Sequence, residues 1–327
     1  MRSGNGWVTC EQGHQHWGLF GAAGLLAYAP DPDDPAVTLV LLQHRARWSH
    51  QGGTWALPGG AMDSDETPAE AALREADEEC MLDPKLVVPR GMYSEEHGGW
   101  AYHTILAQAT EPFRVYSDAY ESDENRWVPA GQVGRLDLHP GFAVSWPVLR
   151  EALAPLTVIV DGTMFTGSTG FTGSTGPADA AVRLRARLTG LTRAGLPALP
   201  DGFAAPPLVR WYPDYVLVLD GPVLGDADAP AAAADTGAAD TGAATTGQAS
   251  PAARYSWNQP LVVRTAEVRV VGLAAGARAD DALADLARVT PAPRLVVSDR
   301  PVARDRALAA GAGPVGLDWL LRLGLDS

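Results

Sequence analysis

The sequence predicts an α+β sandwich in residues 1–150, followed by an α/β domain with a mainly parallel sheet in residues 156–327. Three observations support this fold class. The length of 327 residues exceeds that of one typical domain. In the first part, apolar strand-like runs surround one strong helical segment. In the second part, continuous apolar runs alternate with helical segments, which is typical of buried parallel strands.

The first part has one well-marked helix, predicted from Pro68 to about Cys80. Pro68 suits the first helical turn, where its missing N–H costs nothing. Thr67 and Glu70 have the spacing of a capping box. A Gly- and Pro-rich loop over residues 49–60 precedes this helix. Strands are expected at Gly18–Tyr28, Ala36–His44, Tyr102–Ala109 and Asn125–Val128.

The second part begins with the apolar run TVIVD, which ends at Asp161. Further strands are expected at Tyr215–Asp220, Val268–Leu273 and Leu295–Asp299, and helices at Ala178–Leu191, Asp280–Val289 and Val302–Ala310. Low-complexity tracts at residues 165–176 and 231–253 interrupt the pattern. They have too few apolar residues to order themselves, so we expect mobile loops there.

The charge of the chain is unevenly distributed. The net charge is −14, and residues 1–155 hold ten basic residues against 22 acidic ones, compared with 15 against 17 in the remainder. An acidic first part argues against a large nucleic-acid footprint there. It suits a site whose carboxylates bind cations, which in turn bind an anionic substrate.

Hydrophobic residues make up 46% of the chain, an ordinary value for a globular protein. No run approaches the roughly 18 apolar residues of a membrane span. The first residues lack the apolar segment of a secretory signal, so the sequence predicts a cytoplasmic protein without membrane contact.

Two cysteines, Cys10 and Cys80, allow no disulfide framework. Cys10 lies near His14 and His16, which suggests a metal site. Zinc normally takes about four ligands in paired clusters, and no second cluster follows. The sequence therefore favours an ordinary turn over a zinc site at this position.

Three glutamates, Glu75, Glu78 and Glu79, have the i, i+3, i+4 spacing that places them on one face of the predicted helix. Clustered carboxylates repel one another unless cations are bound. Beside the loop LPGG, with Gly59 and Gly60, they make a plausible Mg²⁺ or Mn²⁺ site, because such hard cations prefer oxygen ligands and bridge to phosphates. A solvated helix face would have a similar composition, and the glutamates alone do not decide between the two.

The wider spacing decides in favour of a site. From Gly60 the chain has the pattern G-x5-E-x7-R-E-x-x-E-E, with Glu66 and Arg74 at its fixed positions. This pattern resembles the Nudix box, the signature of hydrolases that act on nucleoside diphosphates linked to another moiety. The similarity extends over about residues 15–150.

The resemblance implies that Glu75, Glu78 and Glu79 bind the metal, and that one of them could act as a base. The carbonyl of Gly59 or Gly60 would complete the shell, and Arg74 would hold the catalytic carboxylate in place through an ion pair with Glu66. Two positions depart from the family pattern. Met81 replaces the glycine that ends the helix in a left-handed conformation, and Ala76 replaces a bulky aliphatic residue.

Nudix enzymes often recruit another acid from a neighbouring loop. Glu121 and Glu124 are the candidates here, and Glu95 and Glu96 are weaker ones. Trp48, Trp55 and Tyr102 could stack on a base, although aromatic residues near strands are more often part of a core. The residues predicted to bind the substrate are Glu66, Glu121, Glu124 and Trp55.

In the second part, Asp161, Asp280, Asp281 and Asp299 lie at strand ends or at a helix start. Ligands of open α/β sheets bind at that edge, and acids meeting there could bind Mg²⁺ for phosphodiester hydrolysis. The segments VIVDG, DDALADLA and VVSDR resemble those of PIN/NYN-type nucleases. Thr163 and Met164 stand where that family commonly has asparagine, and strand-ending aspartates are also simple turn formers.

Three hypotheses follow. The first is a Nudix-type pyrophosphohydrolase that uses Mg²⁺ or Mn²⁺ to cleave a diphosphate linkage in a nucleotide or a nucleotide-sugar-type small molecule. The second is an RNA-processing protein whose C-terminal nuclease-like domain acts while the Nudix domain senses a nucleotide. The third is a non-catalytic regulator that binds a nucleotide.

Overall fold

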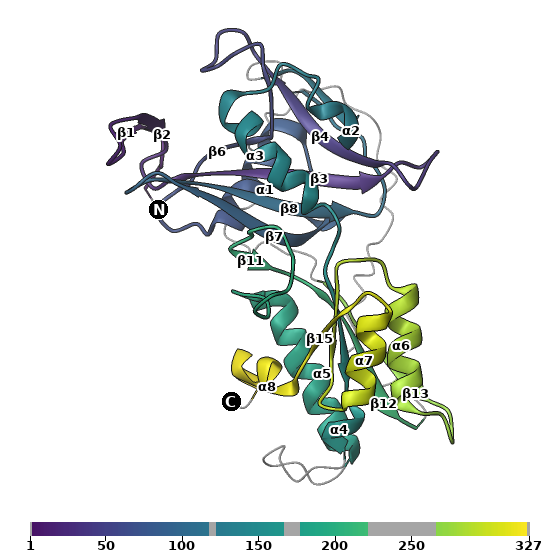
Figure 1. Cartoon of the computed structure of the whole chain (residues 1–327). Coiled ribbons are helices and arrows are strands. Elements are labelled where there is room, and N and C mark those ends of the chain that lie inside the picture. The colour runs from purple at the N-terminus through teal and green to yellow at the C-terminus, as the bar shows by residue number, and fades with distance from the viewer. Residues whose placement is uncertain (1, 118–121, 167–176, 222–265, 326–327) are drawn as a thin grey trace, which may run out of the picture.

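The computed structural model describes residues 2–117, 122–166, 177–221 and 266–325. Figure 1 shows two parts, with the N-terminal part and its sheet above the C-terminal part and its sheet. The low-complexity tract at 231–253, and all but the first two residues of the tract at 165–176, lie outside the described residues. None of the helices within the described ranges is both long enough and apolar enough to cross a membrane.

The N-terminal part is built on a mixed sheet in the order β11-β7-β8-β3-β4-β5, with β6 paired to β3 and β9 paired to β4. The pairing of β3 with β8 is parallel, and the other pairings are antiparallel. Its strands are β3 (Ala22–Pro30), β4 (Thr38–Arg45), β5 (Trp55–Ala56), β6 (Gly59–Ala61), β7 (Val87–Glu96), β8 (Ala101–Ala109), β9 (Ser122–Pro129) and β11 (Arg210–Trp211).

Helices cover both faces of this sheet, as predicted for an α+β sandwich. Helix α1 (Pro68–Cys80) packs on one face, where Leu73 contacts a core that includes Leu25 of β3. Helix α3 (Pro140–Glu151) packs on the other, where Trp146 shares a core with Leu26. Neighbouring residues of β3 thus serve opposite cores, which follows from the alternation of side chains along a strand.

The predicted helix is confirmed, because α1 spans Pro68–Cys80 and carries the full capping box of Thr67 and Glu70. Strand β7 and helix α3 were not predicted. Pro89 interrupts β7 next to a register shift, and a proline inside a run disfavours a strand prediction. Pro147 lies inside α3 and hides its helical pattern in the same way.

The C-terminal part contains the predicted parallel sheet, in the order β13-β12-β10-β14-β15. Helix α5 (Pro177–Ala194) lies on one face, and α6 (Ala279–Val289) and α7 (Pro301–Ala309) lie on the other (Figure 1). The strands are β10 (Thr157–Asp161), β12 (Asp214–Asp220), β13 (Val268–Leu273), β14 (Arg294–Val297) and β15 (Gly313–Val315). The short elements are α2 (Ala130–Val133), α4 (Thr163–Thr166), α8 (Leu317–Leu320), a 3₁₀ turn (Pro84–Leu86) and a π turn (Leu321–Leu325).

One segment of the C-terminal half joins the N-terminal sheet. Strand β11 pairs with β7, matching Trp211 to Gly91. An ion pair of 2.8 Å links Arg90 of β7 to Asp214, the first residue of β12. Buried residues of both parts, such as Trp146 and Tyr215, belong to one continuous hydrophobic core. The two sheets are therefore packed together.

Candidate active site

The site forms where β6 runs beside β3 and faces helix α1. The backbone N–H of Gly59 donates a hydrogen bond of 2.8 Å to Oε2 of Glu79. At Gly60, a Cβ would lie 2.7 Å from the carboxylate of Glu75, closer than real Cβ atoms approach any heavy atom. Gly60 thus allows the carboxylate of Glu75 to approach the backbone closely.

Arg74 is the centre of the ion pairs around this helix. Its Nε and Nη2 donate to the two carboxylate oxygens of Glu66 at 2.6 and 2.9 Å. Its Nη1 lies 2.7 Å from Glu75 and 3.3 Å from Glu78. The predicted Arg74–Glu66 pair is present, and its bidentate geometry fixes the orientation of the guanidinium.

The same network shifts the ionisation of its members. Burial acts to raise the pKa of Glu66, but hydrogen bonds from Arg74 and from the Asp63 N–H outweigh it and leave the pKa lowered. Burial acts to lower the pKa of Arg74, and the carboxylates of Glu66 and Glu75 reverse this and raise it. For Glu78, burial dominates over the attraction of Arg74 and raises its pKa.

The three glutamates border one large cavity of about 1120 Å³. The three side chains differ in exposure: that of Glu78 is 49% exposed, that of Glu75 is 15% exposed, and Glu79 is buried. The cavity is also lined by aromatic side chains from four separate segments, namely Trp7, Trp17, Trp48, Trp100, Tyr102 and Phe142. A volume of this size accommodates a nucleotide-sized ligand.

The remaining predicted residues are distributed more widely. Trp55 does not line the cavity; it is buried in the core, with Arg126 stacked 4.6 Å above its ring. Glu124 is paired with Arg126 on β9. Glu121 lies outside the described residues. Glu95 lines the cavity, and burial raises its pKa, so the acid given less weight from the sequence is the better placed.

Helix α1 ends at Met81, which has the left-handed values φ 55° and ψ 37°. Its N–H bonds to the carbonyls of Ala76 and Asp77. The structure thus retains the conformation that the glycine of the box would adopt, with a methionine in its place. Ala76 lies on the side of α1 that faces the sheet, where it is fully buried in the core.

Comparison with known proteins identifies the family. A family model described as the NUDIX domain matches residues 21–151. A Mycobacterium tuberculosis protein named 8-oxo-dGTP diphosphatase 3, a name given there as provisional, is 48% identical over 161 residues, which cover 47% of this chain and 72% of that protein. The chain belongs to the Nudix hydrolase family.

Two further proteins are similar to this chain. A nucleoside triphosphate pyrophosphatase/Nudix hydrolase fusion protein of Bifidobacterium longum is 44% identical over 155 residues, covering 47% of this chain and 32% of that protein. The crystal structure of the Nudix hydrolase RenU from M. smegmatis is 51% identical and covers 45% of this chain and 94% of that one, with a TM-score of 0.43.

Nudix enzymes generally use a divalent metal, and the residues present fit such an ion. Helix α1 offers carboxylate oxygens, the ligands that Mg²⁺ and Mn²⁺ prefer, on a face that borders the cavity. The space at Gly60, which a Cβ would fill, keeps the backbone close to Glu75. The donor chemistry and the close backbone approach both suit a hard cation.

The four aspartates of the C-terminal part do not all come together. Arg300 ion-pairs with Asp161 at 3.3 Å and with Asp280 at 3.4 Å. Asp281 pairs instead with Arg306, and Asp299 accepts a hydrogen bond from the N–H of Leu317. Arg300 thus binds two of the four aspartates, and among the described residues the four do not form a group of closely spaced ligand atoms.

The aromatic wall of the cavity was not predicted in full. Trp7 and Trp17 belong to a two-stranded hairpin, β1 (Trp7–Thr9) with β2 (Gln15–Trp17), that precedes the matched domain. Each lies in a strand of three residues, which is too short for a periodic pattern to mark it. The hairpin is seated on the turn between β7 and β8, where the N–H of Glu11 bonds to the carbonyl of Gly98, and both side chains border the cavity from there.

Proposed function

We propose that the Nudix domain hydrolyses a diphosphate linkage in a nucleoside triphosphate or related nucleotide, with Mg²⁺ or Mn²⁺ as cofactor. The observation that carries this proposal is the convergence of Glu75, Glu78 and Glu79 with the Gly59–Gly60 turn at the edge of one large cavity. The family membership of the chain supports the reaction class.

In this proposal Glu75, Glu78 and Glu79 bind the metal, together with the carbonyl of Gly59 or Gly60. A bound divalent ion polarises a phosphoryl oxygen and lowers the pKa of water. Arg74 and Glu66 position the ligands, since the guanidinium fixed by Glu66 also contacts Glu75 and Glu78. Glu78, the most exposed of the three, is the carboxylate best placed to accept a proton from attacking water.

The substrate we propose to test first is an oxidised purine nucleoside triphosphate. The mycobacterial relative carries a name for activity on 8-oxo-dGTP. The cavity of this chain offers several exposed aromatic faces, including Trp48, that could stack on a purine. Free cysteines and a nucleotide substrate are consistent with the cytoplasm as the compartment.

The test is release of phosphate, pyrophosphate or nucleoside monophosphate from a panel containing 8-oxo-dGTP, the ordinary (d)NTPs, ADP-ribose and dinucleoside polyphosphates, with Mg²⁺ or Mn²⁺. We expect turnover on at least one nucleotide, highest with 8-oxo-dGTP, and loss of turnover in Glu78→Gln. Absence of turnover across the panel, or full activity of Glu78→Gln, would overturn the proposal.

We do not extend the proposal to RNA cleavage by the C-terminal part or to a PIN/NYN nuclease identity. The parallel sheet is of the expected kind, but Arg300 occupies the space between Asp161 and Asp280. A positive charge bound to both carboxylates competes with the Mg²⁺ that a nuclease would need there.

A further inference from the structure

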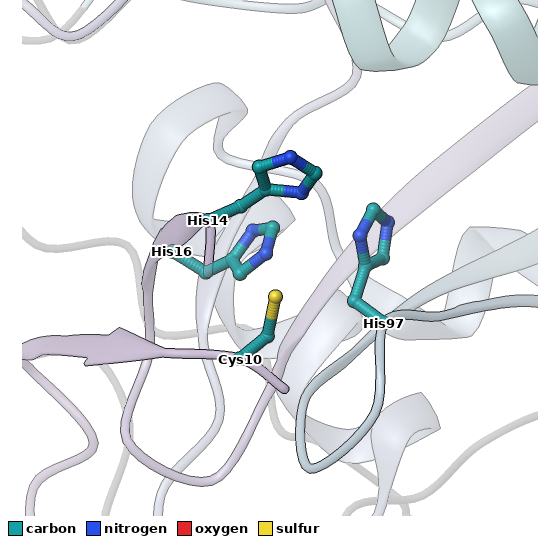
Figure 2. A group of neighbouring side chains, drawn as sticks. All are labelled: Cys10, His14, His16 and His97. Carbon is teal, nitrogen blue, oxygen red and sulfur yellow. The ribbon is translucent and has the colours of Figure 1, made fainter. Parts of the chain in front are cut away.

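A group of potential metal ligands lies outside the Nudix box. Cys10, His14, His16 and His97 each offer one sulfur or ring nitrogen atom, and these four atoms all lie within 4.8 Å of one another. Figure 2 shows the sulfur of Cys10 and the three rings directed toward a common space. Among the described residues it is the one group of three or more His, Cys, Asp or Glu side chains whose ligand atoms lie this close together.

The N-terminal hairpin places three of these side chains on one face. His16 is paired with Val8 in the β1–β2 ladder, and the N–H of Cys10 donates to the carbonyl of His14 at 2.9 Å at the start of the turn. Residues that face each other across the strands, and residues two apart along a strand, point to the same side. Gly13, at φ 83°, supplies the turn that brings His14 back toward Cys10.

The fourth side chain comes from the turn between β7 and β8. The N–H of His97 bonds to the carbonyl of Trp100 at 2.8 Å, and the N–H of Glu11 in the hairpin bonds to the carbonyl of Gly98 at 3.0 Å. The ring of Trp100 stacks on that of His16 at a centroid distance of 4.0 Å. These contacts seat the hairpin on the turn, so the His97 ring lies beside those of His14 and His16.

Two ring nitrogens in this group are buried and have no hydrogen-bond partner, namely Nε2 of His16 and Nδ1 of His97. A buried polar atom without a partner costs about 1–3 kcal/mol, so two such nitrogens within one group of four side chains call for a shared partner. A cation that accepts nitrogen lone pairs is one such partner. This observation is independent of the clustering and points to the same ligand.

We propose that Cys10, His14, His16 and His97 bind one Zn²⁺ ion. Zinc takes sulfur and imidazole nitrogen in tetrahedral geometry, and four protein ligands leave no open position, which defines a structural site. Zinc-bound donors stand roughly 3.5 Å apart, so the group needs to contract by about 1 Å, within the reach of side-chain rotation. Binding releases the thiol proton of Cys10 to solvent and uses the three imidazoles in their neutral form.

The site is separate from the divalent-metal site of the proposed hydrolase in both chemistry and role. Nitrogen and sulfur donors select against Mg²⁺, which prefers oxygen. A two-stranded hairpin is at best marginally stable alone, and this one exposes about half of Trp7. A zinc ion that ties the hairpin to the β7–β8 turn would fix the wall of the cavity formed by Trp7, Trp17 and Trp100.

The experiment measures metal content in the full-length chain, expressed with zinc in the medium and purified without chelator after removal of any histidine tag. We expect one zinc per chain in the wild type, and its loss in Cys10→Ser and in His97→Ala. Cys80→Ala and His50→Ala serve as matched controls, because Cys80 lies in the core beside α1 and His50 lies outside the group. Glu78→Gln must also retain zinc, which separates this site from the Nudix carboxylates.

Replacement of zinc by Co²⁺ gives a second readout that needs no activity and no folded variant of Cys10. A thiolate ligand to Co²⁺ produces an intense near-ultraviolet charge-transfer band, and imidazole and carboxylate sites do not. We expect the band in the wild type and in Cys80→Ala. The inference is overturned if the wild type carries no stoichiometric zinc and shows no such band, or if Cys10→Ser and His97→Ala keep the metal.

Discussion

At the scale of single residues, the candidate active site depends on one close approach and one shared cation. Gly60 leaves space for the carboxylate of Glu75, and Arg74 connects that carboxylate to Glu66. These residues could be predicted because all of them lie between residues 60 and 75, at the fixed positions of the Nudix box. Trp55 lies close to that stretch in the sequence, but its side chain is buried in the core. This could not be predicted, because nothing in its local sequence distinguishes a buried aromatic residue from one that stacks on a ligand.

Gly60→Ala should lower kcat/KM by roughly ten- to a hundred-fold, because the added Cβ displaces the Glu75 carboxylate by a fraction of an ångström. Gly131→Ala is the matched control, since a Cβ at that position meets nothing within 4 Å. Steady-state kinetics of both variants, alongside their thermal midpoints, make the comparison. Equal kcat/KM for the two variants would contradict the account.

His139 should make the fold sensitive to mild acid. Burial, with the nearby charges of Arg45 and His50, lowers its pKa to about 4. In the unfolded chain the pKa is about 6.5, so the unfolded state binds the proton first and stability falls as the pH drops from about 6.5 toward 4. Protonation would also remove the acceptor at Nδ1 that caps α3 through the N–H of Gly141.

We therefore expect the wild type to lose about 1 kcal/mol more unfolding free energy than His139→Asn between about pH 7 and pH 5, a value reduced for the partial exposure of the ring. Asparagine is a suitable replacement because it caps helices without titrating. Urea unfolding at the two pH values provides the measurement. Parallel losses in the two proteins would exclude His139 as the cause.

At the scale of elements, helix α1 shows how far local signals extend. Both of its ends were predicted, because Thr67, Glu70 and Pro68 mark the start and the family pattern marks the stop. Strand β7 was missed, because Pro89 and the adjacent register shift break the alternation that identifies a strand. Its neighbour β8 defines its place in the sheet, and that information is not local.

Met81→Gly should raise the unfolding free energy by about 0.5–1 kcal/mol, because the left-handed conformation at φ 55° is strained for methionine and free for glycine. Little packing is lost, since Met81 is 43% exposed. At the end of α7, Ala310 has φ −85°, so Ala310→Gly should destabilise the protein instead. The measurement is the shift of the denaturant midpoint relative to the wild type. Shifts of the same sign in the two variants would refute this interpretation of the helix end.

At the scale of the whole molecule, the two sheets share one continuous core, and strand β11 from the C-terminal half joins the N-terminal sheet. The sequence predicted two kinds of sheet correctly, but it contained no sign that β11 would join the first sheet or that His97 would lie beside Cys10. Contacts of this kind depend on the complete topology. Local periodicity therefore predicted the elements better than it predicted their partners.

Because the core is shared, calorimetry should show one cooperative unfolding transition for the chain. Arg90→Ala should lower its midpoint without splitting it, since Arg90 is largely buried and links β7 to Asp214 and Gln108. Arg322→Ala, which breaks an exposed pair, is the control and should have little effect. Two resolved transitions in the wild type would show that the halves unfold separately.

The most direct test of the central claim is hydrolysis of 8-oxo-dGTP and dGTP in ¹⁸O-labelled water with Mg²⁺ or Mn²⁺, comparing the wild type with Glu78→Gln. We expect nucleotide turnover by the wild type, with the label in one phosphate-containing product, and a rate at least about a hundred-fold lower in a Glu78→Gln protein of unchanged thermal midpoint. Metal-independent turnover, or equal rates in the two proteins, would contradict this claim.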